Sequence, residues 1–138
     1  MKLLKGAGVF GIEMFKTRDN KVLINEIAPR VHNSGHYTIE ACVTNQFEQH
    51  IRAIAGLPLG KTKMKVPSAI MINILGERLG EAKVTGLEKA LLLPNVTVYI
   101  YGKKETKPER KMGHITVFDN KITSAYNKAV IARKLIKI

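Results

Sequence analysis

The chain has 138 residues, of which 45% are apolar and 25% charged, and its net charge is +12. This length allows one compact domain or two small lobes and excludes a complete multidomain enzyme, and the composition is that of a globular protein with a core. No apolar run approaches the roughly 20 residues that a membrane-spanning helix needs, and residues 1–5 have no signal-peptide core, so neither a membrane protein nor a secreted one is expected.

The positive charge is concentrated in the second part of the chain. Residues 1–60 carry 7 basic and 5 acidic side chains, whereas residues 61–138 carry 16 and 6. This field favours phosphate-bearing partners. With four Tyr, four Phe and no Trp there is little aromatic stacking for nucleic acid, which is therefore not an expected partner.

Cys42 is the one cysteine, which excludes an internal disulfide and indicates a reducing cytoplasm. Its apolar neighbours predict a buried, inert thiol.

The first elements predict a β-hairpin. Residues 8–15 and 22–28 are rich in Val, Ile, Leu and Phe without helical spacing, and residues 17–20 between them have turn chemistry. If the turn pairs Lys16 with Lys21, Glu13 lies opposite Ile24. Glu13 and Glu26 are then diagonal neighbours on the same face of the hairpin. Residues 29–36 contain Pro, Gly and several polar side chains and are expected to form a loop.

A single amphipathic helix is predicted to follow the loop. Apolar residues recur from Ile39 to Ile54 at steps of three and four, Thr38 is a suitable N-cap, and Gly56 followed by Pro58 is a stop signal. The basic segment 60–65 then marks a lobe boundary. We therefore expect a first domain over residues 1–60 and a second over residues 61–138.

The second domain is predicted to be a small β-rich lobe of barrel character. Residues 68–75, 97–101 and 114–118 have the β-branched alternation of strands. Residues 88–93 suit a short helix, and residues 123–135 a terminal helix with Ala125, Ala129, Val130 and Leu135 facing inward. The overall fold class is therefore α+β.

Two carboxylates on the expected hairpin suggest a metal site. Glu13 and Glu26 lie on an otherwise apolar surface, where two negative charges repel each other and are costly to desolvate. A divalent cation removes both problems, and carboxylates combined with substrate phosphates are the usual Mg²⁺ arrangement. The alternative is that both glutamates pair with lysines on a solvated face.

Polar residues follow the second glutamate in a loop that a rigid strand would hold in place. They are Arg30, His32, Asn33, Ser34 and His36. Arg30 can hold a carboxylate or phosphate through two parallel hydrogen bonds, and the alternative is an ordinary exposed turn. A zinc site built from His32, His36, Cys42 and His50 matches no common ligand spacing.

The residues described so far resemble one family closely. The matching stretches are Gly8–Phe15, Asn25–Thr38, Gln46–Ala53, Gly56–Gly60, Tyr101–Lys103 and Arg110–His114. They resemble the N5-carboxyaminoimidazole ribonucleotide synthetases, which are ATP-grasp ligases of purine biosynthesis. The resemblance implies the carboxyl-terminal part of an ATP-grasp domain, made of antiparallel strands and an amphipathic helix, followed by the small lobe.

The resemblance also implies roles for individual residues. Glu13 and Glu26 correspond to the Mg²⁺ ligands, and Asn25 and Glu26 to residues at the nucleotide site. Arg30, His32 and Asn33 correspond to catalytic residues that hold bicarbonate, its carboxyphosphate intermediate and aminoimidazole ribonucleotide. Lys103 and Arg110 correspond to residues that grip the 5′-phosphate of that substrate. ATP and Mg²⁺ are the implied cofactors, and a homodimer is the implied assembly.

Two departures from the wider pattern matter. Many ATP-grasp members have Glu-x-Asn at the second metal position, whereas Ala28 follows Glu26 here. The phosphate-covering loop, the adenine pocket and the amino-terminal domain have no counterpart, so we expect the chain alone to be inactive and the missing region to be supplied by the same or a separate polypeptide. The alternatives are a part of formate-dependent glycinamide ribonucleotide transformylase, whose loop is expected to read Asp-Thr-Gly after the histidine, or a non-catalytic module that binds phosphate, nucleic acid or a subunit.

Overall fold

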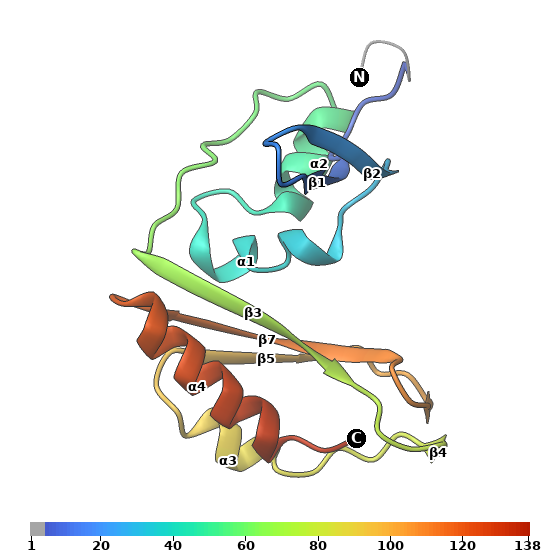
Figure 1. The fold of residues 1–138 in the computed structure, drawn as a ribbon, viewed down its shortest axis with the longest axis vertical. Coiled ribbons are helices and arrows are strands. Elements are labelled where there is room, and N and C mark those ends of the chain that lie inside the picture. The colour runs from blue at the N-terminus through green and yellow to red at the C-terminus, as the bar shows by residue number, and fades with distance from the viewer. Residues whose placement is uncertain (1–4) are drawn as a thin grey trace. The chain divides into compact units, whose positions relative to one another are not determined.

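The computed structural model describes residues 5–138, and the chain forms two compact units, Met1–Lys65 and Val66–Ile138 (Figure 1). The observed division falls slightly after the predicted boundary at residue 60. Residues 61–65 belong to the first unit because their backbone bonds to residues 41–44. For example, Val43 N–H donates to the Lys63 carbonyl and Lys65 N–H donates to the Ala41 carbonyl.

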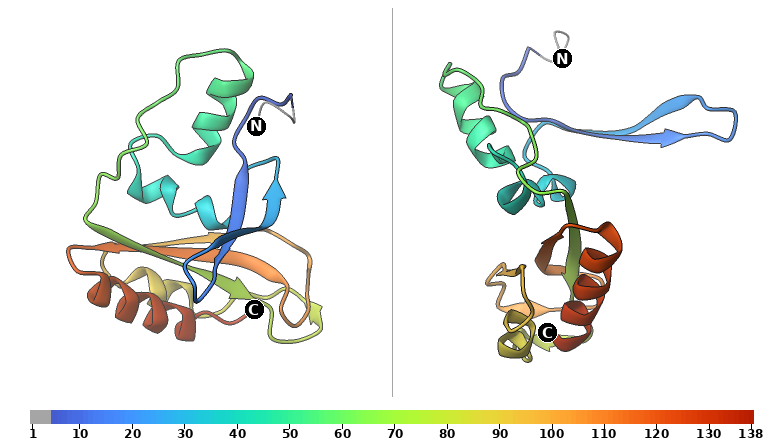
Figure 2. Two further views of the ribbon diagram at one scale, coloured as in Figure 1. Left: turned by 45° about the horizontal axis from the view of Figure 1, so that its top comes forward. Right: turned by 90° about the vertical axis from the view of Figure 1, so that its left-hand side faces the viewer.

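The first unit begins with the predicted hairpin, made of β1 (Gly11–Lys16) and β2 (Val22–Ala28). In Figure 2 this hairpin extends away from the helices of its own unit as a long ribbon. The predicted register is wrong, because Lys16 pairs with Val22 and not with Lys21. The register is shifted because Thr17 bonds to Lys21: Thr17 N–H donates to the Lys21 carbonyl, and the Thr17 hydroxyl accepts from Lys21 N–H.

The single predicted helix is in fact two helices, α1 (Thr38–Ala41) and α2 (Gln46–Ile54), preceded by the 3-10 turn η2 (Asn33–Gly35). Cys42 is extended and bridges to Met64, which interrupts the helical backbone. Asn45 then caps α2, since its side-chain oxygen accepts from Phe47 N–H and Glu48 N–H at 3.0 Å each. The apolar period continued across this break, which is why the pattern suggested one helix. The predicted stop is correct, with Gly56 at a φ of 66°.

The second unit is built on a three-stranded antiparallel sheet in the order β3-β7-β5. Its strands are β3 (Ser68–Leu75), β5 (Val96–Ile100) and β7 (Lys111–Asp119), so all three predicted strands are present. A two-residue ladder joins β4 (Gly80–Glu81) to β6 (Glu105–Thr106). The expected barrel character is not confirmed, because among the described residues this sheet is open, with β3 and β5 as its edges.

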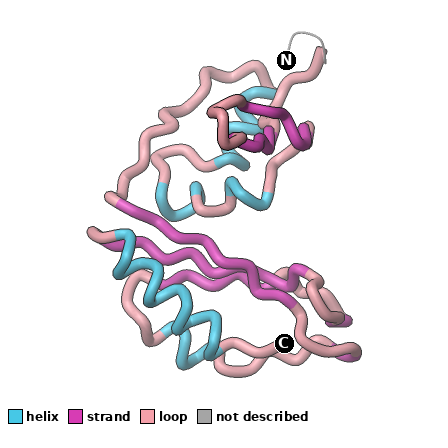
Figure 3. The backbone as a smooth tube through the Cα atoms, viewed as in Figure 1, coloured by secondary structure: helices cyan, strands magenta, loops and turns pink. Residues whose placement is uncertain are grey.

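Two helices, α3 (Leu87–Leu91) and α4 (Ile122–Leu135), pack on one face of that sheet, as Figures 1 and 3 show. Alanines on α4 allow the helix to lie close to the strands. Ala125 and Ala129 are fully buried as predicted, and Ala132 joins them, whereas Val130 is only half-buried. The core between the layers consists of Ile74, Ala90, Met112, Ile115, Val117, Ala125, Ala129, Ala132, Ile136 and Ile138.

The described part of the first unit has no comparable core. Its buried apolar residues are Ala28, Ala41 and Cys42. The large apolar side chains of the hairpin are between 42% and 65% exposed: Ile12, Met14, Phe15, Val22, Leu23, Ile24 and Ile27. Exposed apolar surface is typical of places where another polypeptide or a ligand binds. Among the described helices, none combines the length and apolar character needed to cross a bilayer.

Candidate nucleotide and metal site

A β-bulge brings the two predicted metal carboxylates together. Glu13 is the direct partner of Glu26 across the ladder, so both side chains project from the same face. Asn25 is the extra residue of the bulge, because Ile24 pairs with Met14. Its side chain turns to the same face, where Nδ2 donates to Glu13 Oε2 at 3.2 Å. Bulges near active sites re-aim side chains in this way, and here the bulge gathers three predicted site residues.

The chemistry of this group suits a hard divalent cation. Like charges directly opposite each other destabilise a sheet, and a shared cation removes that repulsion. The donors are carboxylate oxygens, which Mg²⁺ prefers, and Glu13 is about half-exposed, so water and phosphate oxygens can complete the coordination. Residues 5–138 contain no group of three or more His, Cys, Asp or Glu side chains placed to hold a metal by themselves. An ion held here therefore needs ligands beyond these two carboxylates, which water or phosphate oxygens can supply.

His32 connects the loop after β2 to this carboxylate pair. Its imidazole packs against Gly11, where a Cβ atom would lie 2.7 Å from the His32 Cβ, so a larger residue would displace the ring. Its Nε2 lies 3.5 Å from Glu13 Oε1. This distance exceeds that of an ordinary hydrogen bond, but contacts of catalytic groups often tighten only when substrate is bound.

The other ring nitrogen of His32 sets the tautomer. Ser34 N–H donates to Nδ1 at 3.4 Å, and the Ser34 hydroxyl lies 2.8 Å from the same atom. A backbone N–H can only donate, so Nδ1 carries the lone pair and the proton of the neutral ring is on Nε2, facing Glu13. His32 is thus arranged to donate a hydrogen bond to the carboxylate.

Arg30 and Asn33 flank His32 along the same loop. Arg30 follows the buried end of β2, and its N–H donates to the Ala28 carbonyl in a tight turn. Its exposed guanidinium uses one N–H on the Val31 carbonyl and keeps further donors for an anion. Asn33 opens η2, directly after His32. The structure therefore places Arg30, His32 and Asn33 in one short segment that begins where the carboxylate-bearing strand ends.

Gln46 is a residue of this site that sequence reasoning did not single out. It is only 7% exposed, and its side-chain amide bonds both to the backbone of His32 and to the ring of His36. The His36 ring also stacks on Phe47 with an interplanar angle of 7°. A polar residue on the buried side of an amphipathic helix was the available signal, since buried amides are held by specific partners.

The predicted phosphate-binding residues lie in the second unit, between β5 and β7. Lys103 Nζ donates to the Lys111 carbonyl, and it lies 5.8 Å from the centre of the Tyr101 ring. Arg110 adjoins Lys111, and its Nη1 donates to the Glu105 carbonyl at 2.9 Å. Lys103 and Arg110 therefore lie on one connection of the chain, and each retains donors for an anion.

The alternative zinc set is not assembled. His50 Nδ1 accepts a hydrogen bond from Val9 N–H at 3.1 Å, and Cys42 is buried with its backbone bridged to Met64. Burial raises the pKa of the Cys42 thiol, which keeps it protonated and suits the predicted inert role.

Comparison with known families accounts for both units. Residues 1–47 match the model of the ATP-grasp domain, and residues 69–128 match that of the phosphoribosylaminoimidazole carboxylase C-terminal domain. The two matches define the class that the chain resembles: an ATP-grasp portion in the first unit, followed by a carboxylase C-terminal domain in the second. Within that class, the relatives and structural neighbours that the chain is similar to are N5-carboxyaminoimidazole ribonucleotide synthetases and phosphoribosylaminoimidazole carboxylases.

Curated relatives carry the names of that family. The chain is 49% identical over 133 residues to the phosphoribosylaminoimidazole carboxylase of Candida albicans, covering 93% of this chain and 23% of the relative. It is 55% identical over 109 residues to the N5-carboxyaminoimidazole ribonucleotide synthase of Bacillus subtilis, covering 79% of this chain and 27% of the relative. The chain thus spans about a quarter of the length of these relatives.

Solved structures with the same names match the chain over most of its length. The N5-carboxyaminoimidazole ribonucleotide synthetase of Thermotoga maritima matches with a TM-score of 0.90 and 56% identity, over 99% of this chain and 38% of that one. The N5-carboxyaminoimidazole synthase of Aspergillus clavatus, in complex with ADP and 5-aminoimidazole ribonucleotide, matches with a TM-score of 0.78 and 40% identity, over 92% of this chain and 34% of that one. These names favour the carboxylating branch over the transformylase alternative.

Proposed function

We propose that this chain supplies the metal-binding carboxylates and part of the substrate site of an ATP-dependent ligase that carboxylates 5-aminoimidazole ribonucleotide with bicarbonate. The observation that carries the proposal is the direct cross-strand pairing of Glu13 and Glu26, with Asn25 turned to the same face by the bulge. The adjacent loop with Arg30, His32 and Asn33 adds anion-binding and hydrogen-bonding groups beside this face.

Mg²⁺ is the metal that these residues fit, with Glu13 and Glu26 as its protein ligands. When bound, the ion neutralises charge that builds on the ATP phosphates during transfer. Asn25 orients Glu13 by donating to one carboxylate oxygen, while His32 faces the other. The residues around the pair therefore fix its direction, as outer-shell groups do for metal ligands.

The reaction proceeds in two transfers. An oxygen of bicarbonate attacks the γ-phosphorus of ATP, which forms carboxyphosphate and releases ADP. The exocyclic amine of aminoimidazole ribonucleotide then attacks the carboxyl carbon, the bond from that carbon to the phosphate oxygen breaks, and the amine loses a proton. Arg30 is placed to hold the anionic intermediate through charge-assisted hydrogen bonds, and His32 and Asn33 orient the reacting groups.

Lys103 and Arg110 are the proposed contacts for the 5′-phosphate of the ribonucleotide. Both lie on the connection between β5 and β7, and both have basic side chains that suit a phosphate. Their position in the strongly basic second part of the chain also steers an anionic substrate toward them.

The proposed activity requires a further polypeptide region, in the same or a separate chain, that completes the nucleotide site. The chain covers about a quarter of its relatives, and the apolar hairpin surface is suited to such a region. A homodimer of the complete enzyme and a cytoplasmic location are part of the same proposal, the latter supported by the reduced, buried Cys42.

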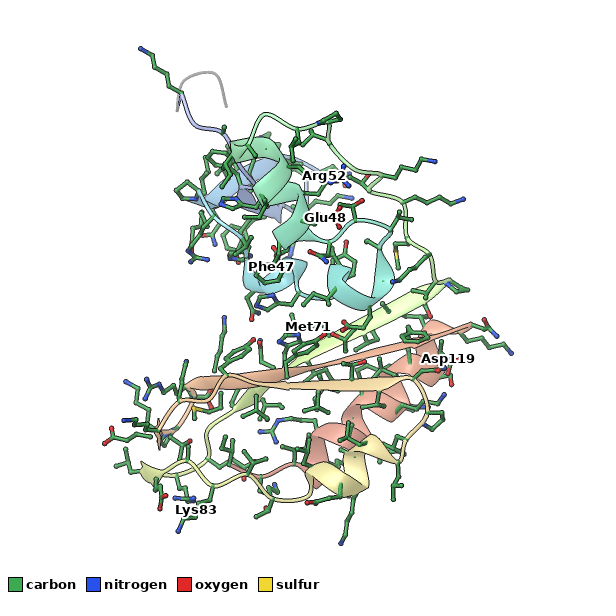
Figure 4. The ribbon with its side chains drawn as sticks, turned by 180° about the vertical axis from the view of Figure 1, so that it is seen from behind. Phe47, Glu48, Arg52, Met71, Lys83 and Asp119 are labelled. Carbon is green, nitrogen blue, oxygen red and sulfur yellow. The ribbon has the colours of Figure 1, made fainter. Side chains whose placement is uncertain are left out.

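A chimera tests the proposal. This chain would replace the matching 38% of the Thermotoga maritima synthetase. The chimera should consume ATP only when bicarbonate and aminoimidazole ribonucleotide are present, and Glu26→Ala should abolish Mg²⁺-dependent nucleotide binding. Glu48→Ala is the matched control, because Glu48 is exposed on α2, where Figure 4 shows it beside Arg52, its partner at 2.6 Å.

Two results would contradict parts of this proposal. One is ATP-dependent carboxylation by the purified 138-residue chain alone, which would refute the requirement for a further region but not the ligase function. The other is phosphate or nucleic-acid binding that falls steeply with salt and survives Glu13→Ala, in a chimera without ligase activity. That pattern indicates a binding module that acts through its charge.

A further inference from the structure

The side chain of Gln46 holds the backbone of His32 at two points. His32 N–H donates to Gln46 Oε1 at 2.9 Å, and Gln46 Nε2 donates to the His32 carbonyl at 2.9 Å. The primary amide therefore bonds to the peptide groups of His32 as a neighbouring strand would. Because the backbone N–H only donates and the carbonyl only accepts, the orientation of the Gln46 amide is fixed.

The same amide extends its hold to the end of the loop. Gln46 Nε2 lies 3.0 Å from His36 Nδ1, so its second hydrogen binds that ring nitrogen. Gly35 packs so closely that an added Cβ atom would overlap Gln46 Oε1. The Gln46 backbone N–H donates to the Thr38 hydroxyl, which in turn donates to the Gly35 carbonyl. Residues 32–36 are thus held against the start of α2 by one buried residue.

His32 connects Gln46 to the hairpin, because its backbone bonds to Gln46 and its ring contacts residues of β1. Its backbone is fixed by Gln46, and its ring is fixed between Gly11, Ser34 and the Glu13 carboxylate. A shift of the His32 backbone would move its ring away from Glu13 or force it against Gly11. The contacts therefore form a continuous series from α2 to the proposed metal carboxylate.

We propose that Gln46 is a positioning residue of the ligase site, which acts through His32 and does not itself touch substrate. The role of the loop in catalysis rests on the proposed function, whereas the hold on the loop rests on the contacts alone. A displacement of about 1 Å in a catalytic group can reduce a rate about 10²-fold, so the loss of this hold should be visible in turnover.

The same helix provides a matched control. Gln49 also binds both groups of one residue: its Nε2 donates to the Gly60 carbonyl at 2.7 Å, and its Oε1 accepts from Gly60 N–H at 3.0 Å. Gly60 is not part of the His32 loop. Gln46→Glu and Gln49→Glu therefore remove the same kind of amide donor and add the same charge. Only Gln46→Glu changes contacts to the His32 loop of the proposed site.

Amide hydrogen exchange on the full 138-residue chain is the first measurement. Gln46→Glu should accelerate exchange over residues 32–36 by about tenfold or more, and Gln49→Glu should leave these residues unchanged while accelerating exchange near Gly60. Gln46→Met, which removes all three polar contacts of the side chain without adding charge, should reproduce the first effect. Unchanged exchange at residues 32–36 in both Gln46 variants would overturn the proposal.

Turnover of the chimera is the second measurement. Gln46→Glu should lower kcat by about 10-fold to 100-fold with little change in KM for ATP, whereas Gln49→Glu should stay within about twofold of the parent. Equal rates in the two variants would overturn the positioning role. An inactive parent chimera would instead refute the proposed function, and the exchange measurement would still decide whether Gln46 holds the loop.

Discussion

Asp119 joins the end of β7 to α4 through its carboxylate. Oδ2 accepts from Lys128 Nζ at 2.7 Å and from the Ser124 hydroxyl at 2.6 Å, and Oδ1 accepts from Asn120 N–H. Figure 4 shows Asp119 at the end of β7, beside α4. The Lys128 ammonium, with these two further hydrogen bonds, lowers the pKa of the Asp119 carboxyl from 3.8 to about 2.

This lowered pKa predicts an acid-dependent loss of stability. The ionised carboxylate is favoured in the folded state, so its contribution is complete above the unfolded pKa near 3.8 and is lost as the pH falls toward the folded pKa of about 2. Asp119→Asn should therefore lower the free energy of unfolding at pH 6, and its difference from the parent should shrink between about pH 4 and pH 2.

Urea unfolding at a series of pH values measures this difference. Lys128→Met should weaken the same pH dependence, because it removes the strongest partner of Asp119. A constant difference between Asp119→Asn and the parent from pH 6 to pH 2 would show that the carboxylate contributes no charge-dependent stability.

At the scale of the element, α3 begins at a glycine that no other residue can replace without strain. Gly86 is the N-cap of α3, with a φ of 76°, and an added Cβ atom would overlap the carbonyl oxygen of Leu135 at the end of α4. This glycine therefore permits both the turn into α3 and the close approach of the two helices.

Gly86→Ala should destabilise the second unit by at least about 3 kcal/mol, because it combines left-handed backbone strain with a backbone overlap. Gly102→Ala is the control: Gly102 has a φ of 67° but no atom within 4 Å of an added Cβ, so strain alone should cost roughly 1–2 kcal/mol. Denaturant unfolding of both variants measures the two costs. Equal losses would mean that the contact with Leu135 has no effect.

At the scale of the whole molecule, the two units differ in how they bury apolar surface. The buried core cluster belongs to residues 66–138, whereas the hairpin of the first unit leaves its apolar side chains exposed. Burial of apolar surface is the main favourable contribution to folding. The second unit should therefore be the more stable of the two.

Limited trypsin digestion of the full chain tests this difference. Cleavage should occur first in the first unit, including the exposed turn with Arg18 and Lys21, and a fragment close to residues 66–138 should persist, as identified by mass spectrometry. If the fragment that persists comes instead from residues 1–65, the core of the second unit does not determine the stability of the chain.

The strands and the terminal helix could be expected from local patterns, whereas the roles of the proposed site residues came from the family resemblance. Strand alternation, helix caps and turn residues act over a few positions, so β2, β3 and α4 were anticipated almost to the residue. The string from Asn25 to Thr38 was specific enough to indicate the family, which the comparisons confirm.

Only the tertiary structure decided how these elements and side chains meet. The bulge that sets Glu13 against Glu26 depends on the ladder as a whole, and the break between α1 and α2 depends on residues 61–65 pairing with residues 41–44. The hold of Gln46 on His32 spans 14 residues, beyond the reach of any local period. The physical reason is common to all three: hydrogen bonds between distant segments of the chain override what local periodicity predicts.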